Sequence, residues 1–185
     1  GRITGAVPAK GPWGTALQFD GVADVVTVAN HPSVQTVASS TLMMWLQPSQ
    51  LDIRRNPWNK SYGAEGTWTL EPTGVINGYY GAAGADGVPY TQIVMTTPLV
   101  VGEWAHVALV RDLTARTLTW YRNGAVVVSG ASAYPTLLPS IADVTIGRGY
   151  AGAYAGLIDE VALWPRALTA AEISAVYEAT LAGRK

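Results

Sequence analysis

The sequence contains no cysteine, which excludes disulfides, thiol catalysis, zinc–thiolate sites and iron–sulfur clusters. Charged residues make up only 14% of the chain and the formal net charge is −1, so there is no basic footprint for nucleic acid. No apolar run approaches the roughly 18 residues that a membrane-spanning helix needs. Because 49% of its 185 residues are hydrophobic, the chain is expected to fold as one domain with a sufficient core.

Phenylalanine is also scarce, with Phe19 alone against seven Trp and nine Tyr. Trp and Tyr carry a polar group on an apolar ring, and they are typical of places where a ring contacts both the protein and water or a sugar. Two interpretations stay open for each of these rings. It is a core or half-buried strand residue, or it is part of a ligand-binding surface.

Short β-type runs separated by Gly, Pro, Asn and Asp dominate the chain. The Asn123-Gly124 dipeptide predicts a hairpin, because a type I′ turn needs positive φ at both positions. Thr41–Gln47 is apolar on both faces, which is typical of a strand between two layers. The runs expected to form strands are Thr15–Phe19, Asp24–Val28, Thr41–Gln47, Trp68–Leu70, Val75–Tyr79, Thr91–Met95, Glu103–Asp112, Thr117–Arg122, Ala125–Ser129, Val144–Ile146 and Leu157–Trp164.

A helix is predicted only at the end of the chain. Thr169-Ala170-Ala171-Glu172 is a capping box, and apolar residues then recur at helical spacing. We expect this helix to pack on the outside of a sheet or to cover an open end. Strands without intervening helices otherwise predict an all-β fold with antiparallel sheets.

Several segments, taken in order, resemble the laminin-G-like jelly roll of the concanavalin A-like lectin/glucanase superfamily. The similarity covers about residues 11 to 179 and is weakest from Gln50 to Gly66. The segments that carry it are Ala16-Leu17-Gln18-Phe19-Asp20-Gly21, Asp24-Val25-Val26-Thr27-Val28, Gly102-Glu103-Trp104-Ala105-His106-Val107-Ala108, Trp120-Tyr121-Arg122-Asn123-Gly124, Ile146-Gly147-Arg148, Gly156-Leu157-Ile158-Asp159-Glu160-Val161 and Trp164-Pro165-Arg166-Ala167-Leu168-Thr169.

This resemblance implies a two-sheet antiparallel jelly-roll sandwich with a short C-terminal helix. It also implies that Gly14–Asp20 pairs with Leu157–Trp164, so that the first and last strands are neighbours. The expected organisation is an N-terminal extension at residues 1–12, the jelly roll at 13–182 and a tail at 183–185.

The sequence carries no pattern of a known catalytic site. The Glu-x-Asp-x-x-Glu pattern of the glucanase branch is absent, and adjacent carboxylates such as Asp159 and Glu160 point to opposite faces of a strand. The Gly-rich run Gly81–Gly87 lacks the Gly-Lys-Ser/Thr ending of a phosphate loop. His106 is expected to be a core histidine and His31 a surface residue. We therefore predict that the domain is not an enzyme.

A structural calcium ion is the cofactor that the resemblance implies. Relatives with this jelly roll hold such an ion between the first strands and the last, and calcium takes carboxylate and carbonyl oxygens. The matching positions are Asp20 with the Gly21 carbonyl, Asp159 and Asp24. The alternative stays open that Asp20-Gly21 is an ordinary turn and that Asp159 pairs with Arg148 or Arg166.

Two functions are consistent with these observations. The first is a non-catalytic module that recognises carbohydrate, or mediates adhesion, through aromatic residues in loops. The rings expected to bind the sugar are Trp58, Tyr62, Tyr79, Tyr80, Tyr90, Tyr150 and Tyr154, with polar contacts from Arg54, Arg55, Asn59 and Asn77. The second is an assembly domain of a virion or cell-surface protein that binds protein neighbours. Either function implies an extracellular, surface or virion location, without nucleic acid and without membrane insertion.

Overall fold

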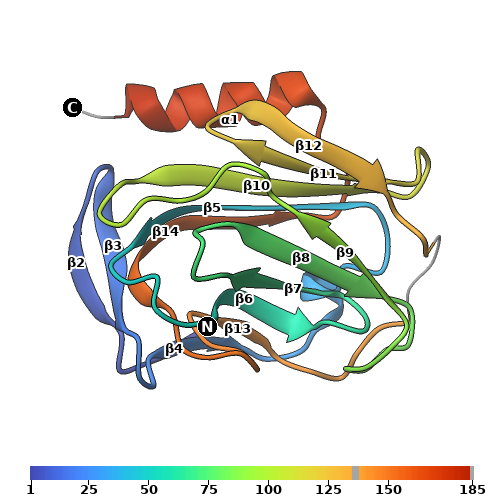
Figure 1. The fold of residues 1–185 in the computed structure, drawn as a ribbon, viewed down its shortest axis with the longest axis horizontal. Coiled ribbons are helices and arrows are strands. Elements are labelled where there is room, and N and C mark those ends of the chain that lie inside the picture. The colour runs from blue at the N-terminus through green and yellow to red at the C-terminus, as the bar shows by residue number, and fades with distance from the viewer. Residues whose placement is uncertain (135–137, 184–185) are drawn as a thin grey trace.

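The structure is a computed structural model, and it describes residues 1–134 and 138–183. Two antiparallel sheets lie face to face, and one α-helix, α1 (Ala170–Ala182), lies across the outside (Figure 1). Within the described residues each sheet has seven strands, in the orders β1-β4-β13-β6-β7-β8-β9 and β12-β11-β10-β5-β14-β3-β2. We call these sheet A and sheet B. The expected jelly-roll sandwich is confirmed.

The strands follow the alternation of the sequence. Their bounds are β1 (Arg2–Thr4), β2 (Val7–Gly11), β3 (Gly14–Asp20), β4 (Val25–Val28), β5 (Ser40–Pro48), β6 (Arg55–Ser61), β7 (Gly66–Leu70), β8 (Ile76–Gly81), β9 (Tyr90–Val94), β10 (Ala105–Asp112), β11 (Thr117–Arg122), β12 (Ala125–Ala131), β13 (Val144–Ile146) and β14 (Ala155–Trp164). A short 3₁₀ helix, η1, covers Pro32–Val34. Asn123 and Gly124 both have positive φ between β11 and β12, as the type I′ turn requires.

The two ends of the jelly roll pair as expected. β14 lies beside β3, with Ala155 opposite Asp20 and Leu157 opposite Gln18. Within the predicted N-terminal extension at residues 1–12, β1 pairs with β4 in sheet A and β2 pairs with β3 in sheet B. Of the predicted tail at 183–185, Gly183 caps α1 and residues 184–185 lie outside the described part of the chain.

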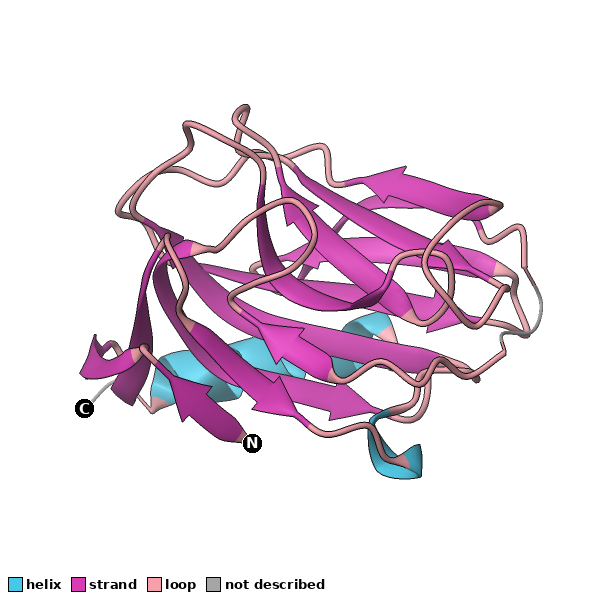
Figure 2. Ribbon diagram, turned by 90° about the horizontal axis from the view of Figure 1, so that it is seen from below, coloured by secondary structure: helices cyan, strands magenta, loops and turns pink. Residues whose placement is uncertain are grey.

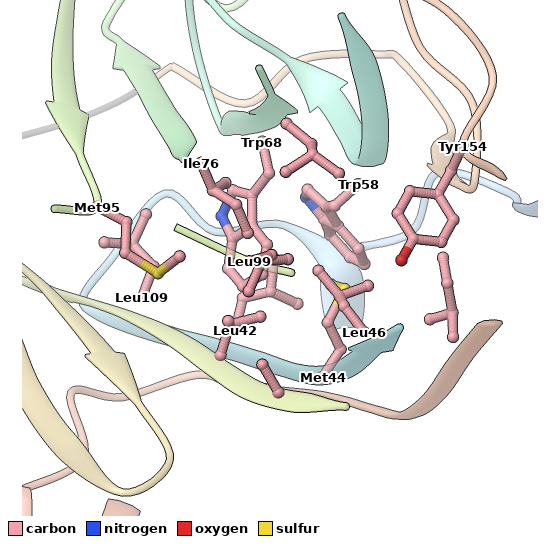
Figure 3. Close-up of a cluster of buried hydrophobic side chains, with 14 of the residues drawn as sticks. Leu42, Met44, Leu46, Trp58, Trp68, Ile76, Met95, Leu99, Leu109 and Tyr154 are labelled. Carbon is pink, nitrogen blue, oxygen red and sulfur yellow. The ribbon is translucent and has the colours of Figure 1, made fainter. Parts of the chain in front are cut away.

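The main core lies between the sheets (Figure 3). Leu42, Met44 and Leu46 point inward from β5 and meet rings from sheet A, among them Trp58 and Trp68. The opposite face of β5 also lies against protein, because Met43 packs in a second cluster with Leu168 and Ile173 at the start of α1. β5 is therefore buried on both faces, as its sequence predicts, and α1 covers the outer face of sheet B (Figure 2).

The helix begins at the predicted capping box. The Thr169 hydroxyl accepts a hydrogen bond from the Glu172 amide over 3.3 Å, and the Glu172 carboxylate accepts one from the Thr169 amide over 2.8 Å. No helix in the described ranges has the length and apolar character needed to cross a bilayer.

Candidate functional site

Four tyrosines and one arginine enclose a pocket of about 230 Å³ on sheet A and its loops. We call it the tyrosine pocket. Arg54 lies directly before β6, Tyr62 follows β6, and Tyr79 and Tyr90 lie on β8 and β9. Tyr150 comes from the loop between β13 and β14. The pocket therefore brings together residues that are far apart in the sequence. The strands β6 to β9, which carry or flank four of the five, lie side by side in sheet A (Figure 1).

The tyrosine rings contact one another and form the walls of the pocket. Tyr62 lies 5.3 Å from Tyr150 and 5.8 Å from Tyr90 between ring centroids, and Tyr90 lies 5.5 Å from Tyr79. Tyr90 and Tyr150 are 40% and 48% exposed, whereas Tyr79 is only 7% exposed. The site thus has a buried ring at its base and two rings that solvent or a ligand can reach.

Arg54 supplies the charge of the pocket, and its partners hold it in place. One terminal nitrogen, Nη2, donates to the hydroxyls of Tyr79 at 3.3 Å and Tyr150 at 3.2 Å. Its Nε faces both carboxylate oxygens of Glu71, at 3.1 and 3.2 Å. The same Glu71 carboxylate also accepts a hydrogen bond from Asn77 over 2.7 Å. The ion pair leaves the pocket without net charge.

The Tyr79 hydroxyl is protonated at neutral pH. Burial raises the pKa of Tyr79, and the neighbouring Arg54 only partly opposes that shift. A neutral hydroxyl can both donate and accept a hydrogen bond. The pocket therefore presents hydroxyl and guanidinium groups beside apolar ring faces.

Asn56 fixes the loop that carries Tyr150. Its Oδ1 accepts a hydrogen bond from the Ala151 amide over 2.7 Å, while its Nδ2 donates to the Trp68 carbonyl over 2.8 Å. The Thr69 and Tyr150 hydroxyls are also hydrogen bonded, at 3.2 Å. Sequence reasoning missed Asn56, Thr69 and Glu71. No sequence pattern around these three residues predicts their roles, because the roles arise only when β6 and β7 pair and the β13–β14 loop lies over them.

Three of the seven predicted sugar-binding rings lie in the core instead. Trp58 is 5% exposed, Tyr80 is 3% exposed and Tyr154 is fully buried, and all three belong to the cluster between the sheets. Figure 3 shows Trp58 and Tyr154 in this cluster. Tyr79 and Tyr80 are consecutive strand residues and therefore point to opposite faces of β8. Trp58, Tyr80 and Tyr154 are thus unavailable to a ligand, and Tyr62, Tyr79, Tyr90 and Tyr150 remain.

Of the four residues predicted to make polar contacts with a sugar, two lie at the pocket and two lie away from it. Arg54 lines the pocket, and Asn77 reaches it through Glu71. Asn59 accepts a hydrogen bond from Thr67 over 2.9 Å on the outer face of sheet A. Arg55 points away from the pocket, into the loops at the end of the sandwich, where its guanidinium donates to the Gly21 and Ala153 carbonyls.

Of the residues proposed for calcium, Asp159 lies apart from Asp20, Gly21 and Asp24. Ala155 lies opposite Asp20, so Asp159 is four strand residues further along β14, about 13 Å away. Asp20 accepts hydrogen bonds from the amides of Val22 and Ala23, and Asp24 accepts one from the Asp20 amide, as in an ordinary turn. The Gly21 carbonyl faces the Arg55 guanidinium at 3.2 Å. These positions do not fit a shared calcium ion, and among residues 1–134 and 138–183 no group of three or more His, Asp or Glu side chains does.

Comparison with known families assigns the chain to a superfamily. The model of the concanavalin A-like lectin/glucanases superfamily matches residues 20–174, which is most of the sequence. The chain belongs to this superfamily. None of the curated proteins matches it.

Several solved structures are similar in fold over nearly the whole of this chain. The binding domain of Paraclostridial Mosquitocidal Protein 1 superposes with a TM-score of 0.83 at 13% identity, covering 97% of this chain and 47% of that one. Domain 4 of AbnA, a GH43 extracellular arabinanase from Geobacillus stearothermophilus solved in complex with arabinotriose, has a TM-score of 0.74 at 20% identity, covering 96% and 82%. The botulinum neurotoxin serotype G binding domain has a TM-score of 0.76 at 11% identity, covering 97% and 46%.

These similarities establish the fold. The chain spans about half of the mosquitocidal and botulinum binding domains, and most of the arabinanase domain. Two of the three are described as binding domains, and the third was solved with a bound oligosaccharide.

Proposed function

We propose that this domain is a non-catalytic module that binds carbohydrate in the tyrosine pocket. The observation that carries the proposal is one small pocket lined by four tyrosine rings and one arginine, which come from separate segments. Sugar rings present apolar C–H faces that pack on aromatic rings, while their hydroxyls need donors and acceptors. Tyr90 and Tyr150 offer exposed ring surface, and Arg54 and the tyrosine hydroxyls offer the polar partners.

The size and charge of the pocket favour one neutral sugar unit. Its volume of about 230 Å³ lies below the roughly 300–1,000 Å³ of pockets that hold larger ligands. Arg54 is already paired with Glu71, so an acidic sugar would have to compete for the guanidinium. A pocket of this small volume accommodates the end of a glycan chain better than an internal segment.

The arabinotriose complex of the AbnA domain supports the proposal at the level of the fold. That domain shows that this architecture can carry an oligosaccharide, although its identity to this chain is only 20%. A glycan ligand would place the domain outside the cell or on a surface, where polysaccharides are accessible.

The experiment is a printed oligosaccharide array, with arabinotriose included, probed with the purified domain. Binding should be reduced at least tenfold in Tyr90→Ala and in Tyr150→Ala, and retained in Val126→Ala, which removes an exposed side chain from β12 in the other sheet. Competition by free monosaccharides for the bound glycan would support a site for the end of a glycan chain. An array without any bound glycan, together with concentration-dependent oligomers in solution, would overturn the proposal in favour of an assembly domain.

A further inference from the structure

Arg55 and the loops around it form a cation site. The guanidinium donates to four oxygens: Nη1 to the carbonyls of Gly21 at 3.2 Å and Ala153 at 2.7 Å, and Nη2 to Gln50 Oε1 at 2.9 Å and Asp52 Oδ1 at 2.7 Å. The side chain is only 4% exposed. A long charged side chain at this depth requires such partners.

The four oxygens come from three different loops. Gly21 lies in the turn between β3 and β4, Gln50 and Asp52 lie between β5 and β6, and Ala153 lies between β13 and β14. Two carbonyls, one amide oxygen and one carboxylate are also the ligand types that a calcium ion takes in proteins. The guanidinium therefore holds these three loops together, as a bound divalent cation does in other proteins. Here the cation is a side chain of the protein itself.

The contact with Arg55 requires glycine at position 21. Its φ is +80°, which favours glycine, and a Cβ at this position would lie 2.8 Å from Nη1 of Arg55. The turn thus brings its carbonyl and its bare Cα against the guanidinium. Only a residue without a side chain allows that approach.

We propose that Arg55 is the resident cation of this site, so that the domain is stable without calcium, and that removal of its side chain opens a site for a small cation. The carbonyl of Gly21, which the superfamily resemblance assigned to a metal, is held by the arginine. The site also supports the tyrosine pocket. Arg55 tethers Ala153 in the loop that carries Tyr150, while the preceding residue, Arg54, points into the pocket.

The test compares melting temperatures of the wild type, Arg55→Ala and the surface control Arg166→Ala, which removes a side chain that is 54% exposed. EDTA or millimolar calcium should shift the wild type by less than ~2 °C, because the guanidinium already occupies the four oxygens of this site. Arg55→Ala should melt about 10 °C lower, since the Gly21 and Ala153 carbonyls lose their charged donor, whereas Arg166→Ala should change little.

Rescue separates a cation site from simple packing. Methylguanidinium chloride and calcium chloride should each raise the melting temperature of Arg55→Ala by several degrees relative to sodium chloride of equal ionic strength, and neither should raise that of the wild type. Arg55→Lys is measured in parallel, since it keeps the charge but lacks the planar fork. Its melting temperature should fall by about half as much as that of Arg55→Ala.

Three results would overturn the proposal. They are a wild type that EDTA destabilises and calcium restores, an Arg55→Ala variant that melts like Arg166→Ala, and an Arg55→Ala variant that neither cation rescues. If Arg55→Ala does not fold alone, refolding in methylguanidinium and the stability of Arg55→Lys decide the question. All these measurements are independent of glycan binding.

Discussion

The Arg54 guanidinium donates a hydrogen bond to the Tyr150 hydroxyl over 3.2 Å, and its central carbon lies 5.8 Å from the centroid of the same ring. Ninety-six positions separate the two residues in the sequence. The contact links the start of β6 to the β13–β14 loop, and it fixes the one exposed ring that no strand holds. Arg54 therefore shapes the pocket as well as offering donors to a ligand.

This relationship gives the first prediction. Arg54→Lys should lower affinity for the bound glycan about tenfold, because one ammonium cannot replace the planar fork that reaches Glu71 and both tyrosine hydroxyls. The melting temperature should change by less than ~3 °C, since Arg54 is 46% exposed and exposed ion pairs contribute little. Isothermal titration and differential scanning fluorimetry measure the two effects. Unchanged affinity would show that Arg54 takes no part in binding.

A buried ion pair in the same sheet gives the second prediction. Lys60 Nζ lies 2.8 Å from Glu65 Oε2, and both side chains are fully buried. Nζ also donates to Asn30 Oδ1 and to the Ala142 carbonyl. Lys60→Met alone should cost about 3–5 kcal/mol of unfolding free energy, because it leaves the carboxylate without its charge partner.

The matched variant for this pair is the double substitution Lys60→Met/Glu65→Leu. It should recover a large part of the loss, since the remaining groups carry no uncompensated charge. Urea unfolding of the two single variants and the double variant measures the coupling. Additive losses would contradict the account of Lys60 and Glu65 as one unit.

His106 gives a prediction about pH. The side chain is 2% exposed, lies 5.3 Å from Trp45 and 5.9 Å from Tyr177 between ring centroids, and its Nδ1 has no hydrogen-bond partner in the described part of the chain. Burial lowers the pKa of His106 from 6.5 to about 4. The imidazole is therefore neutral in the folded protein at neutral pH, which agrees with its expected place in the core.

The lowered pKa of His106 makes the folded protein less stable at acidic pH. Because the unfolded chain binds the His106 proton more tightly, the contribution of His106 to stability is constant above pH 6.5 and falls as the pH drops towards 4, by up to roughly 3 kcal/mol. Urea titrations between pH 7.5 and 5 should show this slope in the wild type and a smaller slope in His106→Phe. Equal slopes in the two proteins would contradict the assignment.

The contrast between Trp58 and Tyr90 gives a further prediction. Trp58→Ala should destabilise the fold by about 3–5 kcal/mol, because it removes a large ring from the core between the sheets. Tyr90→Ala should leave the melting temperature within ~3 °C of the wild type, because the ring is 40% exposed. Thermal melts of both variants measure the difference. A Tyr90→Ala variant as unstable as Trp58→Ala would place Tyr90 in the core.

The strands could be predicted where apolar side chains carry the pattern. β5 is apolar on both faces and is covered by sheet A and α1, and the Asn123-Gly124 turn forms the expected hairpin. β6 was missed because Arg55–Ser61 is largely polar. Its burial depends on hydrogen-bond partners from distant segments, such as Asn30 for Lys60 and Ala153 for Arg55, and no local sequence pattern predicts these partners.

The binding residues could be predicted only in part for the same reason. Composition and loop position indicated tyrosines, but not which face of a strand each one occupies. Tyr79 and Tyr80 are equivalent in the sequence, and only the position of sheet B decides that Tyr80 lies in the core and Tyr79 in the pocket. The calcium expectation followed the superfamily pattern, which contains no information about the guanidinium that faces the Gly21 carbonyl.

The most direct test of the central claim is the binding of the wild type and Tyr150→Ala to the same oligosaccharide array, with both proteins shown to be folded by their melting curves. The account predicts a glycan signal in the wild type that falls at least tenfold when this one exposed ring is removed. A signal that Tyr150→Ala retains in full would contradict the tyrosine pocket as the binding site.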